Sequence, residues 1–115
     1  MLIRSQDKTI IVNIDNAFNI AVRDINGGAS IYVGSQSSCS NIAEYSTKAK
    51  AMKVLNMIQE GYEEYKITCT FLTGFTGHRA IVESNDIHVN GFKELVKSFK
   101  KNMVFQIPED SEVEV

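Results

Sequence analysis

Residues 44–65 carry a long helical pattern that limits what the rest of the chain can do. Apolar residues recur in it at intervals of three and four, which places them on one face of an α-helix. They are Ala51, Val54, Leu55, Ile58, Tyr62 and Tyr65. Ser46 or Thr47 can cap the first turn, because a hydroxyl oxygen accepts a hydrogen bond from an unpaired backbone N–H. The residues before this helix read as strands, so we expect its apolar face to lie on a sheet.

The charges along this helix run against its dipole. The first turns carry three lysines and the last turns three glutamates: Lys48, Lys50, Lys53, Glu60, Glu63 and Glu64. The dipole favours the reverse order by roughly 0.3–1 kcal/mol for each surface charge. Two interpretations stay open. The cost is small and offset by screening and by partners elsewhere, or the N–H, hydroxyl and ammonium groups at the helix start form an anion site.

Strand patterns precede the helix. Strands are expected at residues 9–14, 17–23, 29–33 and 41–45. The first of these is β-branched and is expected to be buried. The second alternates, which predicts Phe18, Ile20 and Val22 on its buried face. Asn26-Gly27-Gly28 predicts a hairpin turn, because asparagine and glycine tolerate positive φ.

Three further elements are expected after the helix. Residues 66–72 alternate and predict a strand with Cys69 in the core, and residues 92–102 predict a second helix. Residues 103–107 predict a last strand, which Pro108 ends. Runs of strands followed by helices indicate an α+β fold. We expect an antiparallel β-meander of four to six strands packed against two helices.

Length and composition describe a single globular unit. The chain has 115 residues, of which 43% are hydrophobic and 23% charged. We expect one domain over residues 1–108 and an acidic, mobile tail over residues 109–115. A formal net charge of −2 gives no general attraction to nucleic acid or to an anionic membrane. With no apolar run of membrane-spanning length and no leader pattern, a cytoplasmic location is expected.

Patterns for catalysis and metal binding are missing from the sequence. His78 and His88 have no cysteine or carboxylate at ligand spacing, and the serines after Gly34 lack the second glycine of a nucleophile elbow. Cys39 and Cys69 form no Cys-x-x-Cys pair and are expected to be free thiols. We therefore expect no enzyme, no catalytic residue, no metal and no cofactor.

A glycine-bounded loop, residues 74–79, offers a second binding element. Phe75 supplies an aromatic face and Arg79 a cation, a pairing that suits a base or a sugar-phosphate. Asn90 adds a polar side chain nearby in the sequence. The alternative interpretation, an ordinary hairpin tip on the surface, stays open.

Three stretches carry a resemblance when they are taken together: residues 2–8 with Val12-Asn13, residues 44–48, and residues 105–110. They resemble a group of small proteins encoded by phages and mobile elements of Gram-positive bacteria. The resemblance covers both ends and the main helix start, but not residues 67–92.

Small phage proteins of this size without enzyme motifs are often inhibitors of host defence, so the resemblance implies one of two activities. One is a sponge that sequesters a nucleotide immune signal, as Thoeris anti-defence proteins do for cyclic ADP-ribose derivatives. The other is an anti-CRISPR protein that blocks an effector nuclease by direct contact. The resemblance carries over no binding motif of either kind.

The leading hypothesis is a non-enzymatic, homo-oligomeric binder of a small anionic nucleotide in the host cytoplasm. The helix start is expected to hold phosphate, and the loop to stack on a base and supply polar contacts. The expected ligand-binding residues are Ser46, Thr47, Lys48, Lys50, Phe75, Arg79 and Asn90. The runner-up is an inhibitor that contacts a host defence effector protein through the helix glutamates and the acidic tail. A third possibility is a phage accessory protein with no defence role.

Overall fold

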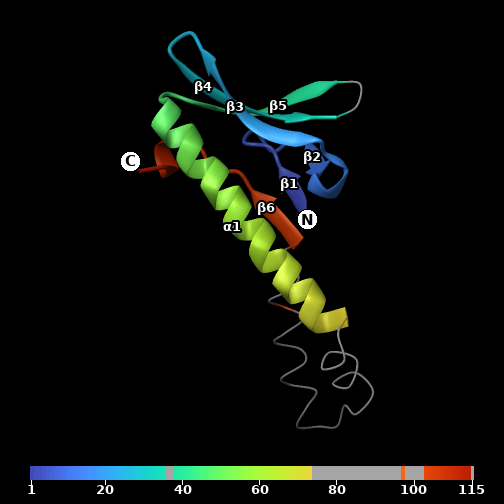
Figure 1. Cartoon of the computed structure of the whole chain (residues 1–115). Helices are drawn as coiled ribbons and strands as arrows, with labels where there is room; N and C mark the ends of the chain where they lie inside the picture. The colour runs from blue at the N-terminus through green and yellow to red at the C-terminus, as the bar shows by residue number, and fades with distance from the viewer. Residues whose placement is uncertain (36–37, 74–96, 98–102, 115) are drawn as a thin grey trace.

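The computed structural model describes residues 1–35, 38–73, 97 and 103–114. This part of the chain is an α+β fold of six strands and one long helix (Figure 1). One sheet has the order β2-β1-β6 and comprises β1 (Leu2–Arg4), β2 (Ile11–Asn13) and β6 (Val104–Gln106). The other has the order β3-β4-β5 and comprises β3 (Asn19–Ile25), β4 (Gly28–Gly34) and β5 (Cys39–Tyr45). The long helix is α1 (Lys48–Thr73), and two short 3₁₀ helices are η1 (Ile14–Asn16) and η2 (Asp110–Glu112).

The larger sheet is an antiparallel meander that confirms the predicted hairpin. Ile25 pairs with Gly28 across a two-residue turn, in which Gly27 has a φ of 82°. Glycine adopts this left-handed conformation without the steric cost that a Cβ would add. β5 returns antiparallel to β4 with a shift in register next to Ile31. This irregularity lets the consecutive residues Ile42 and Ala43 both be buried.

The smaller sheet departs from the expected meander. β1 is antiparallel to β2 but parallel to β6, with Ile3 opposite Phe105. The all-antiparallel prediction is therefore only partly correct. The parallel pair joins residues 2–4 to residues 104–106. Parallel strands are not connected by a tight turn, so no local turn pattern predicts this pairing.

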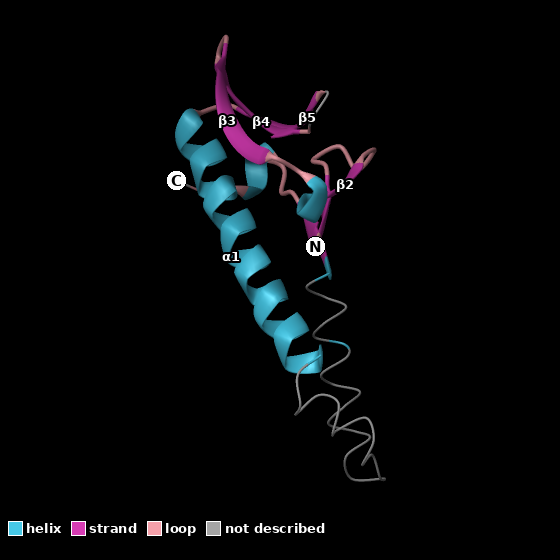
Figure 2. Cartoon of the chain, turned by 45° about the vertical axis from the view of Figure 1, so that its right-hand side comes forward, coloured by secondary structure: helices cyan, strands magenta, loops and turns pink. Residues whose placement is uncertain are grey.

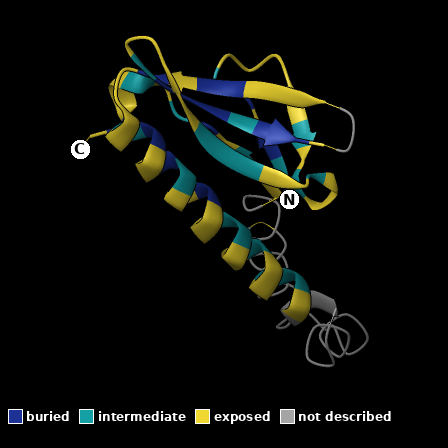
Figure 3. Ribbon diagram, turned by 45° about the horizontal axis from the view of Figure 1, so that its top comes forward, coloured by how far each residue is buried: buried dark blue, intermediate teal, exposed yellow. Residues whose placement is uncertain are grey.

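The helix α1 lies across one face of the larger sheet and contacts all three of its strands. Its buried stripe, Ala51, Val54 and Ile58, faces a buried row on the sheet that includes Ile31 and Val33 (Figure 3). Leu55, Tyr62 and Tyr65, the other residues of the predicted face, are half-buried. The predicted apolar face is thus confirmed. The strands gather along the first part of α1, and its last turns extend beyond them (Figure 2).

The predicted strand at residues 66–72 is wrong, because α1 continues through it to Thr73. No proline or capping glycine follows Tyr65, so nothing in the sequence ends the helix there. Thr68 is accommodated in the helix, since its hydroxyl donates to the carbonyl oxygen of Glu64 (2.9 Å). Cys69 accordingly lies half-buried on a helix rather than within a strand.

Two expectations about burial are also wrong. Only Ile11–Asn13 of the predicted strand 9–14 is a strand, and Ile11 is 59% exposed. Phe18, expected to be buried beside Ile20 and Val22, is 71% exposed. It precedes β3, so the alternation of that strand does not direct its side chain inward.

The described residues of the acidic tail are docked on the fold instead of being mobile. Val113 is buried with the core residues Ile3 and Ile107, and η2 lies near the start of α1 (Figure 1). The predicted strand before Pro108 is confirmed as β6. The expected second helix, residues 92–102, lies outside the described residues apart from Lys97. Within the described ranges, no helix has both the length and the apolar composition that a membrane crossing requires.

Candidate functional site

The start of α1 brings together four of the predicted site residues. Thr47 caps the helix, because its hydroxyl oxygen accepts a hydrogen bond from the backbone N–H of Lys50 (3.2 Å). Ser46 lies between β5 and this cap, and Lys48 is the first helical residue. Hydroxyl, backbone N–H and ammonium groups therefore meet in one region.

A carboxylate of the chain itself binds in this region. The backbone N–H of Ser46 donates to Asp110 Oδ1 (2.8 Å), and the Ser46 hydroxyl donates to both carboxylate oxygens (2.9 and 3.1 Å). The Lys50 ammonium lies 3.3 Å from Asp110 Oδ2 and 3.0 Å from the Asp110 carbonyl oxygen. Ser46 and Lys50 thus bind an anion that the C-terminal segment supplies.

These contacts change the acidity of Asp110. The Ser46 backbone N–H, the Ser46 hydroxyl and the Lys50 ammonium hold the pKa of the carboxyl below its ordinary value of 3.8. The lowered pKa means that these groups stabilise a negative charge.

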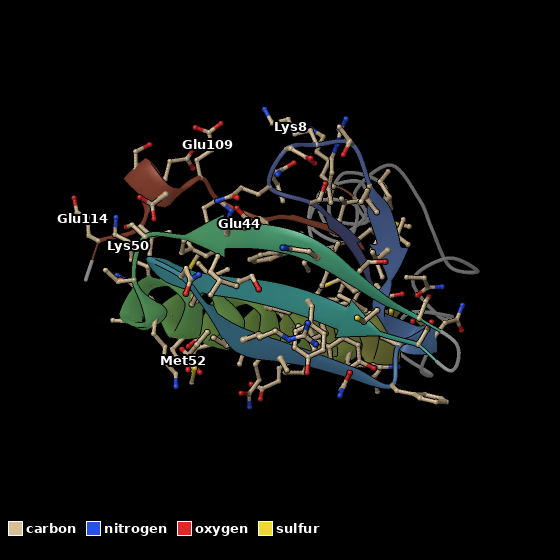
Figure 4. All side chains as sticks on the ribbon, turned by 90° about the horizontal axis from the view of Figure 1, so that it is seen from above. Lys8, Glu44, Lys50, Met52, Glu109 and Glu114 are labelled. Carbon is tan, nitrogen blue, oxygen red and sulfur yellow. The ribbon has the colours of Figure 1, made fainter. Side chains whose placement is uncertain are left out.

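The other lysines of the first turns have partners as well. Lys48 lies 3.7 Å from Asp24 in a pair whose side chains are both well exposed, so this ion pair contributes little stability. The Lys53 ammonium donates to the carbonyl oxygen of Glu114. Lys50, Glu109 and Glu114 lie at the same end of the molecule (Figure 4). Lys50 and Lys53 thus have partners in the acidic C-terminal segment, and Lys48 has its partner in β3.

Three segments that are distant in the sequence meet at this junction: residues 5–6, residues 44–46 and residues 106–110. The Gln6 side-chain amide donates to the carbonyl oxygen of Glu44 (3.0 Å) and accepts from its backbone N–H (3.0 Å). The Tyr45 hydroxyl donates to the carbonyl oxygen of Pro108 (2.6 Å). The Gln106 amide donates to the carbonyl oxygen of Ser5 (3.0 Å). These contacts join residues 5–6 and residues 106–108 to the start of α1.

The remaining predicted site residues are not placed together with this junction. Phe75, Arg79 and Asn90 lie outside the described residues, as do His78 and His88. Glu60, Glu63 and Glu64 are exposed on the later turns of α1. Across the described part of the chain, His, Cys, Asp and Glu side chains form no group of three that could hold a metal ion.

A groove between β3 and α1 is the second candidate site. It encloses about 470 Å³ and is mostly apolar. Ala17, Phe18 and Ile20 line one side, and Leu55 and Tyr62 line the other. The exposed ring of Phe18 adds a large apolar surface, and such groups in a concave surface are typical of binding sites.

One end of the groove is fixed by a polar cluster around Asp15. The Tyr62 hydroxyl donates to Asp15 Oδ1 (3.1 Å), and the backbone nitrogen of Met1 donates to Oδ2 (3.3 Å). The Lys66 ammonium lies 3.9 Å from Oδ1. Slight burial raises the pKa of Asp15, but these hydrogen bonds and charges outweigh it and leave the pKa below 3.8. The cluster joins η1 to α1 next to Tyr62, which lines the groove.

The sequence patterns indicated Asp110 only as part of the acidic tail, and they did not indicate Phe18 as a residue of a site. Asp110 is one of several acids near the C-terminus, and nothing local distinguishes it from the others. Phe18 follows the Asp15-Asn16 pair, and this turn signal is the pattern that indicates a later start of the strand.

Comparison of the chain with protein-family models, with curated proteins and with solved structures finds no match in any of the three.

Proposed function

We propose that the protein is a non-enzymatic inhibitor that acts by direct contact with another protein. The observation that supports this most is the open apolar groove between β3 and α1, with Phe18 71% exposed beside it. Burying a phenylalanine side chain contributes about 1.5–3 kcal/mol, and aromatic anchors dominate protein interfaces. A protein surface that fills the groove would cover Phe18 and gain this free energy.

A protein partner is favoured over a nucleotide because the two candidate sites differ in whether they are already occupied. The anion-binding groups at the start of α1 already bind Asp110, whereas the groove is open. A phosphate must compete with an intramolecular carboxylate at a high effective concentration. Among the described residues none fills the groove, so a protein surface there displaces no described intramolecular contact.

The resemblance to phage and mobile-element proteins suggests the biological setting. In this proposal the chain acts in the host cytoplasm, and its partner is an effector nuclease of host defence, as for anti-CRISPR proteins. The exposed glutamates of α1, Glu60, Glu63 and Glu64, remain a second candidate surface for the same contact.

The test compares Phe18→Ser with Ile67→Ser, two substitutions of apolar side chains that are equally exposed to solvent. Phe18 and Ile67 are each 71% exposed, but only Phe18 lines the groove. We expect Phe18→Ser to weaken binding to a purified CRISPR effector nuclease and to relieve its inhibition, with Ile67→Ser unchanged. Binding is measured by calorimetry and inhibition by DNA cleavage. A panel of defence nucleases that neither binds the wild-type protein nor is inhibited by it would contradict the proposal.

A second candidate function, sequestration of a small anionic nucleotide by a homo-oligomer, is favoured by the anion-binding groups at the helix start. There Ser46, Thr47, Lys48 and Lys50 would take the phosphate after Asp110 is displaced. Phe75 would stack on the base, and Arg79 and Asn90 would supply the polar contacts.

Titration with cyclic ADP-ribose tests this alternative. If it is correct, Asp110→Asn tightens binding by removing the competing carboxylate, and the double variant Lys48→Ala with Lys50→Ala weakens it. Calorimetry that detects no heat of binding with either wild type or Asp110→Asn would count against this ligand.

A further inference from the structure

The two edge strands of the larger sheet, β3 and β5, differ in whether another described segment binds their outer side. At the β5 edge, the backbone N–H of Gln6 donates to the carbonyl oxygen of Ile42 (2.9 Å). The side-chain amide of Gln6 then pairs with both backbone groups of Glu44, as an added strand residue would. This edge is therefore covered by a segment from the start of the chain.

The opposite edge has no such cover among the described residues. β3 pairs with β4 on one side, and no described strand pairs with it on the other. An uncovered edge presents a row of backbone N–H and C=O groups that can pair with another chain. Seen from above, β3 forms one margin of the sheet over α1 (Figure 4).

This edge and the apolar groove adjoin each other. Asn19 and Ile20, the first residues of β3, line the groove together with Leu55 and Ile58 of α1. Hydrogen-bonding groups on a strand and an apolar helix flank therefore face the same space. This is the arrangement in which an extended peptide adds to a sheet edge, with main-chain hydrogen bonds giving affinity and side-chain pockets giving specificity.

We propose that an extended segment of the partner protein adds to the β3 edge as a further strand and places alternate apolar side chains in the groove. This inference rests on the proposed function, because it assigns the mode of contact with the protein partner. Since successive side chains of a strand point to opposite faces, every second residue of the segment would face α1. Those residues would meet Leu55 and Ile58 and cover the ring of Phe18.

The charges along the edge define the chemistry of the segment. One end of β3 carries the Asp24–Lys48 ion pair, and the Asp15–Lys66 pair lies at the other end of the groove. Between these pairs, Ile20, Ala21 and Val22 are uncharged, and the Arg23 guanidinium lies over the Tyr32 ring, 4.4 Å from its centroid. An uncharged segment with alternating apolar residues therefore complements this edge.

A second copy of the chain complements the edge less well. Antiparallel pairing of the full length of β3 with its own copy sets Asp24 opposite Ile20. It also brings Arg23 opposite Ala21. Neither contact pairs charges or buries apolar surface well.

Amide hydrogen exchange with a peptide probe tests the mode of contact. The probe is acetyl-Thr-Val-Thr-Ile-Thr-Val-Thr-amide, and a version with proline at its central residue is the control, because proline removes a ladder donor. We expect every second amide of β3 to exchange about tenfold more slowly once the probe reaches about ten times its Kd. The amides of β5 should be unchanged. Phe18→Ser should weaken probe binding, and Ile67→Ser should not.

Three results would overturn the strand addition. They are protection of α1 without the alternating pattern on β3, the absence of any protection at millimolar probe, and β3 protection that rises with protein concentration without probe. The last result would identify a second copy as the occupant. If a nuclease is bound and inhibited while β3 exchange is unchanged, the direct-contact function survives and only this mode of contact fails.

Discussion

Ser46 donates both its backbone N–H and its hydroxyl to the carboxylate of Asp110, a residue 64 positions later in the chain. The bond from the backbone is 2.8 Å long, and the shorter one from the hydroxyl is 2.9 Å. The contact fixes the C-terminal segment against the start of α1. It also satisfies a backbone donor just before the helix cap.

Replacing Asp110 should release the C-terminal segment in a pH-dependent way. Because its pKa is lowered in the folded protein, the stabilisation is fully present above the ordinary value of 3.8 and is lost as pH falls through the lowered value. We expect Asp110→Asn to speed exchange of the Val113 amide at neutral pH, with the difference from wild type shrinking in acid. Glu112→Gln, an exposed neighbour, is the control. Equal exchange in wild type and Asp110→Asn at neutral pH would contradict the role assigned to this contact.

Tyr45→Phe should destabilise the protein by about 1–2 kcal/mol, because it leaves the carbonyl oxygen of Pro108 without its donor. Burial raises the pKa of Tyr45, and the charges of Asp110 and Glu112 raise it further, so the hydroxyl stays protonated as a donor. Urea unfolding measures the loss. Tyr32→Phe, on a half-buried tyrosine of β4, is the control, and an equal loss in both variants would argue against a specific hydrogen bond.

Gly28→Ala should cost about 1–3 kcal/mol through overpacking. A Cβ at this position would lie 2.1 Å from the carbonyl oxygen of Tyr45, which is backbone and cannot rotate away. Gly27→Asn is the matched control, because its Cβ meets open space and asparagine tolerates the left-handed conformation. Thermal unfolding compares the two variants. A larger loss in Gly27→Asn would show that turn conformation, not close approach, dominates here.

Gln6→Glu should open the β5 edge at a cost of about 1–3 kcal/mol. The carboxylate keeps an acceptor for the Glu44 N–H but faces the Glu44 carbonyl oxygen with no donor. Exchange of the Glu44 amide should become faster, as measured by NMR. Gln59→Glu makes the same chemical change on α1 and should leave the β5 amides unchanged.

The parts of the fold that the sequence predicts are those set by local patterns. The apolar face of α1 follows from spacings of three and four residues, and the first hairpin from an Asn-Gly turn. The end of α1 was misplaced because residues 66–72 alternate in hydrophobicity, which favours a strand. They carry no stop signal, and the helix runs on to Thr73, directly before Gly74.

The parts that escaped prediction depend on contacts between distant segments. Three-residue strands such as β1 and β6 carry too little pattern to show that they pair in parallel. The helix start was identified as a place suited to an anion, but only the folded chain shows that Asp110 is bound there. Likewise, the exposure of Phe18 depends on where β3 begins, which alternation alone does not fix.

The joining of the two chain ends also affects how the protein can acquire its structure. Gln106 reaches Ser5 across 101 positions, and β1 has its parallel neighbour β6 in the same region. Closing such a long loop costs entropy before any contact rewards it, which slows folding. During synthesis, the β3–β4 hairpin and α1 can form before residue 106 has left the ribosome, whereas the smaller sheet cannot be completed until then. The surroundings of Ser5 and β1 are therefore completed only after residues 104–106 have been made.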